Sequence, residues 1–267
     1  AGAAIATVIS QFVSCVWVMK FLLGKKTTIQ IKKEYFKFDL DIMKRVLGLG
    51  FSPFFMSATE GILQVSFNRQ LLFFGGDLAV SSMTIMLSMN QILQLPMEGI
   101  AQGTQPIISY NYGAGNPGRV KAAFRLLLKT SLCYSVILWL FVMLFPGGFA
   151  AMFTTDAELM EYTKTALRIY MAVMFLFGIQ VACQMTFNAL GKAVESIVVA
   201  VMRKFVLLLP LIYIMPQILQ SRQTTAVYMA EPIADTVAVT FTAVLFAVQF
   251  RKVLASMKKK EEYKTAE

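Results

Sequence analysis

The sequence predicts an all-α polytopic membrane protein with about seven transmembrane helices. Hydrophobic residues make up 57% of the 267 positions and charged residues only 15%, whereas soluble domains carry roughly 25% charge. The mean hydropathy is +0.63. The apolar runs are continuous, as helices in lipid require, and lack the alternation of outer-membrane strands. These features argue against a water-soluble enzyme and against a β-barrel.

Seven apolar segments follow one another along the chain, each long enough to cross a hydrocarbon layer of about 30 Å. They cover residues 1–23, 46–74, 79–110, 122–146, 165–190, 195–219 and 226–250. Most connections are short, so consecutive helices are expected to run antiparallel. The chain starts at Ala1, inside the first apolar run and without the basic region of a signal peptide. We therefore expect it to be part of a longer protein.

Two polar stretches contain helix starts. Asp39 in "FDLDIMKRVLGLG" is a good N-cap for the helix that leads into the second span. In "TTDAELMEY", Thr155 and Glu158 have the spacing of a capping box, which predicts a short helix before the fifth span. The tail "KKKEEYKTAE" is polar and is expected to be disordered.

Basic residues occur in alternate connections, which predicts the orientation. They are Lys25, Lys26, Lys32, Lys33, Lys37, Lys44 and Arg45, then Arg119, Lys121, Arg125 and Lys129, then Lys192 with Arg203 and Lys204 on the first turns of the sixth span, and finally Arg251, Lys252, Lys258, Lys259, Lys260 and Lys264. By the positive-inside rule these connections and the C-terminus belong in the cytoplasm. The formal charge of +10 then sets the topology, and no nucleic-acid partner is expected.

Polar side chains also occur inside three of the spans, at helical spacing. The second span has Ser57, Glu60, Gln64 and Asn68, the third has Gln91, Gln94, Glu98, Gln102 and Gln105, and the fifth has Gln180, Gln184 and Asn188. Each set shares one helix face. Any single amide side chain can serve only to form a hydrogen bond between two helices. Three aligned stripes of polar side chains favour a water-accessible cavity.

Glu60 is the strongest candidate for a functional group, because a carboxylate inside a span can exchange a proton or hold a monovalent cation. Glu98 is the second, and it follows Pro96, which frees a backbone carbonyl. The predicted cavity wall comprises Gln64, Asn68, Gln91, Gln94, Glu98, Gln102, Gln184 and Asn188. Glu231 and Asp235, around Pro232, are weaker candidates.

Other chemistry is not expected. "YNYGAGNPGR" lacks the Gly-Lys-Ser/Thr ending of a phosphate-binding loop and reads as a tight turn. The chain has no histidine, and no nucleophile–base pair or metal-ligand set can be placed. We therefore expect neither an enzyme nor a bound cofactor or metal.

Several stretches resemble the multidrug and toxic compound extrusion (MATE) family, with the closest match to its MepA-like bacterial branch. They are "GAAIATVISQ", "FDLDIMKRVLGLGFSP", "LPMEGIAQGTQPIISYNYGAGN", "MFTTDAELMEYTKTALRIY", "FNALGKAVES" and "AEPIAD". The resemblance runs along nearly the whole chain and implies twelve helices in two six-helix lobes. Residues 1–23 would be the last helix of the N-terminal lobe, 24–45 a cytoplasmic inter-lobe loop, 46–250 the C-terminal six-helix lobe and 251–267 a cytoplasmic polar tail.

The resemblance implies a multi-pass plasma-membrane antiporter that exports small cationic, amphipathic drugs in exchange for Na⁺ or H⁺ by alternating access. The family's carboxylate on the seventh helix matches Glu60. Some relatives add an acid on the tenth helix, where this chain has Gln180, Gln184 and Asn188. The expected partners are membrane lipid, the drugs and the N-terminal lobe of the same polypeptide.

Two alternatives stay open. A flippase for a lipid-linked glycan shares the superfold but should have Arg-rich cavity walls, and Arg69 is the only guanidinium predicted deep in a span. A structural membrane subunit without transport activity is the other.

Overall fold

The computed structural model describes residues 2–24 and 39–266. Within these ranges the chain is helical and contains no strand. It divides into two compact units, Ala1–Phe51 and Ser52–Glu267. The first unit contains α1 (Gly2–Leu22), whose residues Ala4–Leu22 are long and apolar enough to cross a membrane. Most of the predicted loop 24–45 lies at 25–38, outside the described residues.

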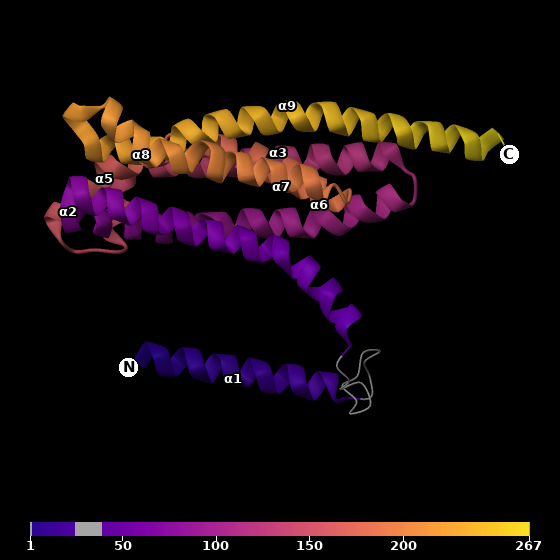
Figure 1. The fold of residues 1–267 in the computed structure, drawn as a ribbon, viewed down its shortest axis with the longest axis horizontal. Coiled ribbons are helices and arrows are strands. Elements are labelled where there is room, and N and C mark those ends of the chain that lie inside the picture. The colour runs from indigo at the N-terminus through magenta and orange to yellow at the C-terminus, as the bar shows by residue number, and fades with distance from the viewer. Residues whose placement is uncertain (1, 25–38, 267) are drawn as a thin grey trace. The chain divides into compact units, whose positions relative to one another are not determined.

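The helix α2 (Leu40–Gly113) has 74 residues and consists of two helices joined at Gly76, where φ is 64° and ψ is −162°. A straight helix of this length would measure about 110 Å, far more than a membrane is thick. Glycine tolerates the positive φ that reverses the chain there. The two arms of α2 therefore fold back on each other (Figure 1) and correspond to the predicted spans 46–74 and 79–110.

The reversal of α2 is held by the start of α9 (Gln223–Ala266). The Thr224 hydroxyl donates a hydrogen bond of 2.9 Å to the Phe74 carbonyl, and the Tyr228 hydroxyl donates one of 2.9 Å to the Ala79 carbonyl. Phe74 belongs to the last turn of the first arm, whose carbonyls lack internal donors, and the Tyr228 bond fixes the first turn of the second arm.

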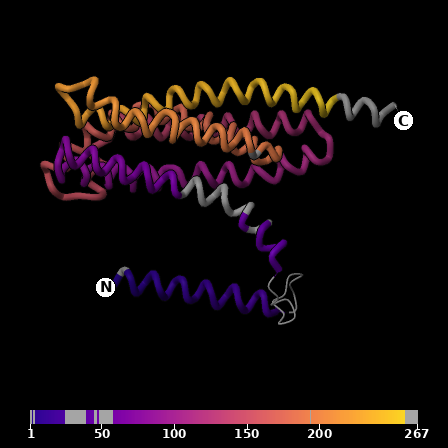
Figure 2. Tube along the Cα trace, viewed as in Figure 1, coloured from indigo at the N-terminus to yellow at the C-terminus, as the bar shows by residue number. Residues whose placement is uncertain are grey.

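The remaining helices of the second unit follow in sequence along the traced chain (Figure 2). They are α3 (Pro117–Leu144), α4 (Pro146–Ala151), α5 (Ala157–Tyr170), α6 (Phe177–Ala189), α7 (Ala193–Val201) and α8 (Leu209–Ile218). Short 3₁₀ turns join α5 to α6 (η2, Met174–Leu176) and α8 to α9 (η4, Gln220–Arg222), and the π-helical segment η3 (Met202–Leu208) continues α7 into α8.

Five helical segments of the described chain pass a length and hydropathy test for membrane spans, or six with the bent pair α5–α6 counted as one span. One of these segments, Ala58–Gly113, contains both arms of α2. With the arms counted separately, every predicted span has a counterpart. The all-α polytopic fold is therefore confirmed.

The fifth span was predicted as one continuous helix over 165–190, and this is wrong. The chain bends by 46° between Ala157–Tyr170 and Met174–Ala189. Side chains of α3 satisfy the carbonyls at the break, because Trp139 Nε1 donates to the Ala172 carbonyl at 2.9 Å and Ser135 Oγ to the Phe175 carbonyl at 2.8 Å. The break depends on a neighbouring helix, so apolar periodicity could not reveal it.

The predicted helix starts are partly correct. Asp39 caps α2, because its Oδ1 accepts hydrogen bonds from the Asp41 and Ile42 amides at 2.9 and 3.2 Å. The cap of α5 is Asp156 and not Thr155, with Oδ1 accepting from the Glu158 and Leu159 amides at 2.9 and 3.3 Å. The charged carboxylate also interacts favourably with the positive end of the helix dipole.

The expected disorder of the C-terminal tail is also wrong, since α9 continues as a helix to Ala266. The tail is rich in Lys and Glu, which are good helix formers. It extends a helix that already exists, so the chain avoids the cost of nucleation.

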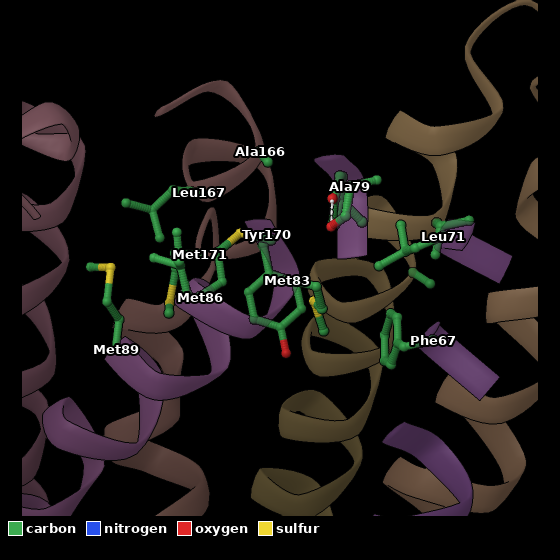
Figure 3. Packing of buried hydrophobic residues seen from close by; sticks show 14 of the residues in the cluster. Phe67, Leu71, Ala79, Met83, Met86, Met89, Ala166, Leu167, Tyr170 and Met171 are labelled. Atoms are coloured by element: carbon green, nitrogen blue, oxygen red, sulfur yellow. Dashed lines mark hydrogen bonds between the residues drawn. The ribbon is translucent and has the colours of Figure 1, made fainter. Parts of the chain in front are cut away.

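Two apolar clusters hold the second unit together. The first joins both arms of α2 to α5 and the turn after it, through Phe67, Leu71, Met83, Leu167 and Tyr170 among others (Figure 3). The second joins α3, α6 and α9, where Phe124, Phe187 and Phe246 pack with ring centroids 4.6 and 5.1 Å apart.

We predict that Gly178→Ala destabilises the bundle. A Cβ at Gly178 would lie 2.5 Å from the Ser131 carbonyl oxygen, and overpacking of this kind costs about 1–3 kcal/mol. Gly103→Ala is the matched control, because nothing lies within 4 Å of the added atom. Thermal unfolding in detergent should show a lower Tm for Gly178→Ala and an unchanged or higher Tm for Gly103→Ala. Equal Tm values would contradict the close packing of α3 and α6.

We also predict that Trp139→Phe destabilises the local structure at the break between α5 and α6. The variant keeps an aromatic ring beside Phe175 but leaves the Ala172 carbonyl without its donor, at a cost of about 1–3 kcal/mol. Amide hydrogen exchange should increase around residues 171–176. Trp17→Phe in α1, where the side chain is 75% exposed, should leave this exchange unchanged.

Candidate functional site

A polar cavity lies inside the second unit, as two adjoining hollows of about 450 and 400 Å³. The first reaches Phe67, Met83 and Tyr170 of the first apolar cluster, and the second reaches Ala101 of the second cluster. Both hollows share the side chains of Glu60, Gln94, Glu98, Arg203 and Lys204. The cavity therefore runs along the bundle between its two apolar clusters, with charged groups at its middle.

Most of the residues predicted for the cavity wall do line it. Glu60, Gln64, Gln91, Gln94 and Glu98 border the first hollow, and Glu60, Gln94, Glu98, Gln102, Gln180, Gln184 and Asn188 border the second. Asn68 and Gln105 are not among the described residues that line either hollow. The Ser57 side chain lies outside the described part of the structure.

Arg203 is the centre of a buried ionic network. Its Nε donates to Asp235 Oδ1 at 2.6 Å and its Nη2 to Glu231 Oε1 at 3.2 Å. The three side chains are only 11–16% exposed, and the guanidinium also lies 5.2 Å from the Phe177 ring centroid. Glu231 and Asp235 were weak candidates from the sequence, and the structure brings both into contact with Arg203.

Lys204 forms the second ion pair of the cavity, from its Nζ to Glu60 Oε1. The two partners differ in environment, since the Lys204 side chain is 16% exposed and the Glu60 side chain 63%. The pair joins the first arm of α2 to η3 across the cavity.

Arg203 and Lys204 were counted among the topogenic charges, on the first turns of the sixth span, but the structure pairs both with carboxylates inside the cavity. They lie in η3, a seven-residue π-helical segment between α7 and α8. Extra residues in a helical turn of this kind occur often at functional sites. Among cations described near this connection, only Lys192 remains as a surface charge, and it pairs with Glu195 at 3.1 Å.

The prediction that Arg69 is the only guanidinium deep in a span is wrong for the same reason. Arg203 is buried in the bundle, whereas Arg69 is exposed. The predicted span 195–219 agrees with Val194–Ile218 in the structure, and what the sequence could not show is the pairing of Arg203 with Glu231 and Asp235.

Carboxylates outnumber cations along the cavity. Glu60, Glu98 and Glu231 line the hollows together with Arg203 and Lys204, and Asp235 borders a small void of about 20 Å³ beside Tyr170. Glu98 has no ion-pair partner in the described part of the chain. The cavity therefore carries a net negative charge and suits a cation.

Amide groups supply the neutral part of the wall. Gln94 Nε2 donates to Asn90 Oδ1 at 2.6 Å. Gln180 is 2% exposed, and its Oε1 has no hydrogen-bond partner among the described residues. Sequence reasoning missed Asn90 and Tyr170 as lining residues. The position of Asn90, four residues before Gln94, is a signal that could have added it to the stripe.

Residues 54–214 match the sequence model of the MatE family. Multidrug export protein MepA from Staphylococcus aureus strain MSSA476 is 23% identical over 214 residues, which cover 80% of this chain and 47% of that protein. The protein of the same name from Staphylococcus saprophyticus has the same identity and coverage. The chain thus spans about half the length of these curated relatives.

Solved structures share the fold. A MATE crystal structure in the bent conformation has a TM-score of 0.81 at 20% identity, covering 96% of this chain and 57% of that one. The outward-facing conformation of a multidrug resistance MATE family transporter has a TM-score of 0.77 at 22% identity, covering 97% and 57%.

The family match covers more than half of the chain, and the polar cavity lies largely within the matched residues. The chain therefore belongs to the MatE family, which the resemblance of its motifs predicted.

Proposed function

We propose that this chain forms the second lobe, and the helix before it, of a secondary active transporter that exports cationic amphipathic compounds in exchange for Na⁺ or H⁺. The observation that carries the proposal is the excess of carboxylates over cations along an amide-lined cavity inside a membrane bundle. Family membership adds support, because matched relatives bear the name multidrug export protein.

Glu60 is the group that exchanges a coupling cation for a drug. It lines both hollows and its side chain is 63% exposed, so a ligand can reach it. A coupling cation and a cationic drug would compete for the same carboxylate, and a difference in affinity between the inward- and outward-facing states would couple their fluxes. Glu98 supplies a second negative charge in the same cavity.

The wall amides orient varied ligands. Gln64, Gln91, Gln94, Gln102, Gln184 and Asn188 each offer a donor and an acceptor to the cavity. Apolar side chains such as Phe67, Met83 and Met185 border the same hollows. Methionine adapts to ligands of different shape, which suits a broad range of amphipathic compounds.

The partner of this lobe is an N-terminal lobe of the same polypeptide. The matched relatives are about twice as long as the aligned part of the chain. Alternating access would then occur between the two lobes, with the basic connections and the C-terminus in the cytoplasm. Asn68, which does not line the hollows, takes no part in this proposal.

A flippase for a lipid-linked glycan is less consistent with the cavity. Arg203 adds a guanidinium that the sequence had not placed, but Glu231 and Asp235 neutralise it. A diphosphate would meet a surplus of carboxylates. A structural subunit has no need for this polar interior, and the family match favours a transporter over an intramembrane enzyme.

We predict that Glu60→Gln abolishes coupled export. In cells that express the full-length transporter, ethidium efflux driven by a Na⁺ or pH gradient should fall by roughly tenfold or more, because the carboxylate that attracts both cations is gone. The gradient that drives wild-type efflux identifies the coupling ion. Glu161→Gln in α5 is the matched control, since Glu161 is exposed, pairs with Lys164 and lies outside the cavity.

Normal efflux by Glu60→Gln, with membrane levels equal to wild type, would show that Glu60 is structural. Coupling would then have to reside in the other lobe. No efflux by wild type under either gradient would refute the transporter proposal itself.

A further inference from the structure

Lys204 occupies the position that a ligand cation would need. Its ammonium contacts the carboxylate of Glu60 inside the cavity, where both residues border both hollows. The proposed function requires Glu60 to bind a coupling cation or a cationic drug. In the present structure a cation of the chain itself fills that place.

The ion pair is poorly suited to a purely stabilising role. The Glu60 side chain is 63% exposed, and pairs with such exposed carboxylates contribute little to stability because water screens them. Lys204 is 16% exposed and has given up most of its hydration to reach this position. A pair of this kind can be opened by another cation at small cost.

Displaced from Glu60, the ammonium of Lys204 has other carboxylates close by. Glu231 and Asp235 both attract Lys204 electrostatically, and Glu231 borders the same hollow. These two acids face a single guanidinium, that of Arg203. The flexible four-carbon stem of lysine allows such a change of partner without movement of the helix.

The charge balance of the paired groups leaves room for one monovalent cation. The carboxylates are Glu60, Glu231 and Asp235, and the cations are Arg203 and Lys204. The cluster therefore carries one net negative charge, which a bound Na⁺ or organic ammonium would neutralise. Glu98, which borders both hollows, adds a second negative charge beside this cluster.

We infer that Lys204 is a built-in competitor for Glu60, which a monovalent ligand cation must displace towards Glu231 and Asp235 in order to bind. This inference rests on the proposed function and concerns the control of its central site. A ligand cation then binds Glu60 only if its affinity is high enough to displace Lys204. Without a ligand, the Glu60 carboxylate remains paired with Lys204.

The test is ethidium binding to the purified full-length transporter, measured by fluorescence polarisation at constant ionic strength. Lys204→Met should lower the Kd for ethidium by about tenfold or more, because the tethered competitor and its positive charge are both removed. Lys204→Arg should bind ethidium no more tightly than wild type. NaCl in place of N-methylglucamine chloride should displace ethidium at lower concentration from Lys204→Met than from wild type, if Na⁺ is the second ligand.

Two controls separate the competition of Lys204 with ethidium for Glu60 from the general effect of removing a positive charge. Lys129→Met removes an exposed charge of α3 outside the cavity and should change the Kd by less than twofold. In a Glu60→Gln background, Lys204→Met should lose most of its gain, because the contested carboxylate is absent. A full gain in that background, or no gain from Lys204→Met alone, would overturn the inference. Lys204→Gln replaces Lys204→Met if the latter does not give a monodisperse protein.

The outcomes also separate this inference from the proposed function. Glu60-dependent ethidium efflux together with an unchanged Kd in Lys204→Met would refute only the role of Lys204. Absence of ethidium binding and efflux in wild type would refute both.

Discussion

The need to neutralise charge inside a membrane bundle is the constraint on which this lobe depends. An isolated ion in a low-dielectric interior costs several kcal/mol even after relaxation, and the bundle contains both acids and bases. Arg203 joins η3 to α9 through Glu231 and Asp235, and Lys204 joins η3 to the first arm of α2 through Glu60. The buried Arg203 pairs tie η3 to α9, whereas the Lys204–Glu60 pair, with its exposed carboxylate, bridges the cavity and adds little stability. The surplus of acid that remains gives the cavity its chemical character.

The backbone obeys a related constraint, since a carbonyl in lipid has no water to bind. The helices are interrupted at several points, and partners from other helices satisfy two of the interruptions. Thr224 and Tyr228 of α9 bind carbonyls at the reversal of α2, while Trp139 and Ser135 of α3 bind those at the bend between α5 and α6. The third interruption, the π-helical segment η3, lies within a continuous helix and contains both Arg203 and Lys204. Irregular backbone thus borders the polar interior, where protein groups can stabilise it.

The charged centre lies between apolar packing on both sides. Phe67, Met83 and Tyr170 of the first apolar cluster border one hollow, and Ala101 of the second cluster borders the other. This arrangement confines the polar groups to the cavity and leaves the outer surfaces of the helices apolar, with exposed residues such as Ile92, Leu126 and Val244. A cation bound as proposed would meet carboxylates and amides that packed helices already position, which lowers the cost of ordering them on binding.

The number and order of the membrane helices, the cap at Asp39 and most of the polar stripe from Gln91 to Gln102 could be predicted from the sequence, because hydrophobic length and helical period are local properties of the chain. The sequence also identified Glu60 and Glu98 as intramembrane acids. The partners of these residues depend on how the helices pack. The tertiary structure placed Arg203 and Lys204 in the cavity, moved the cap of α5 to Asp156 and broke the fifth span where α3 offers donors. Ion pairs and inter-helix hydrogen bonds join residues up to 150 positions apart, and no local pattern encodes which distant groups will meet.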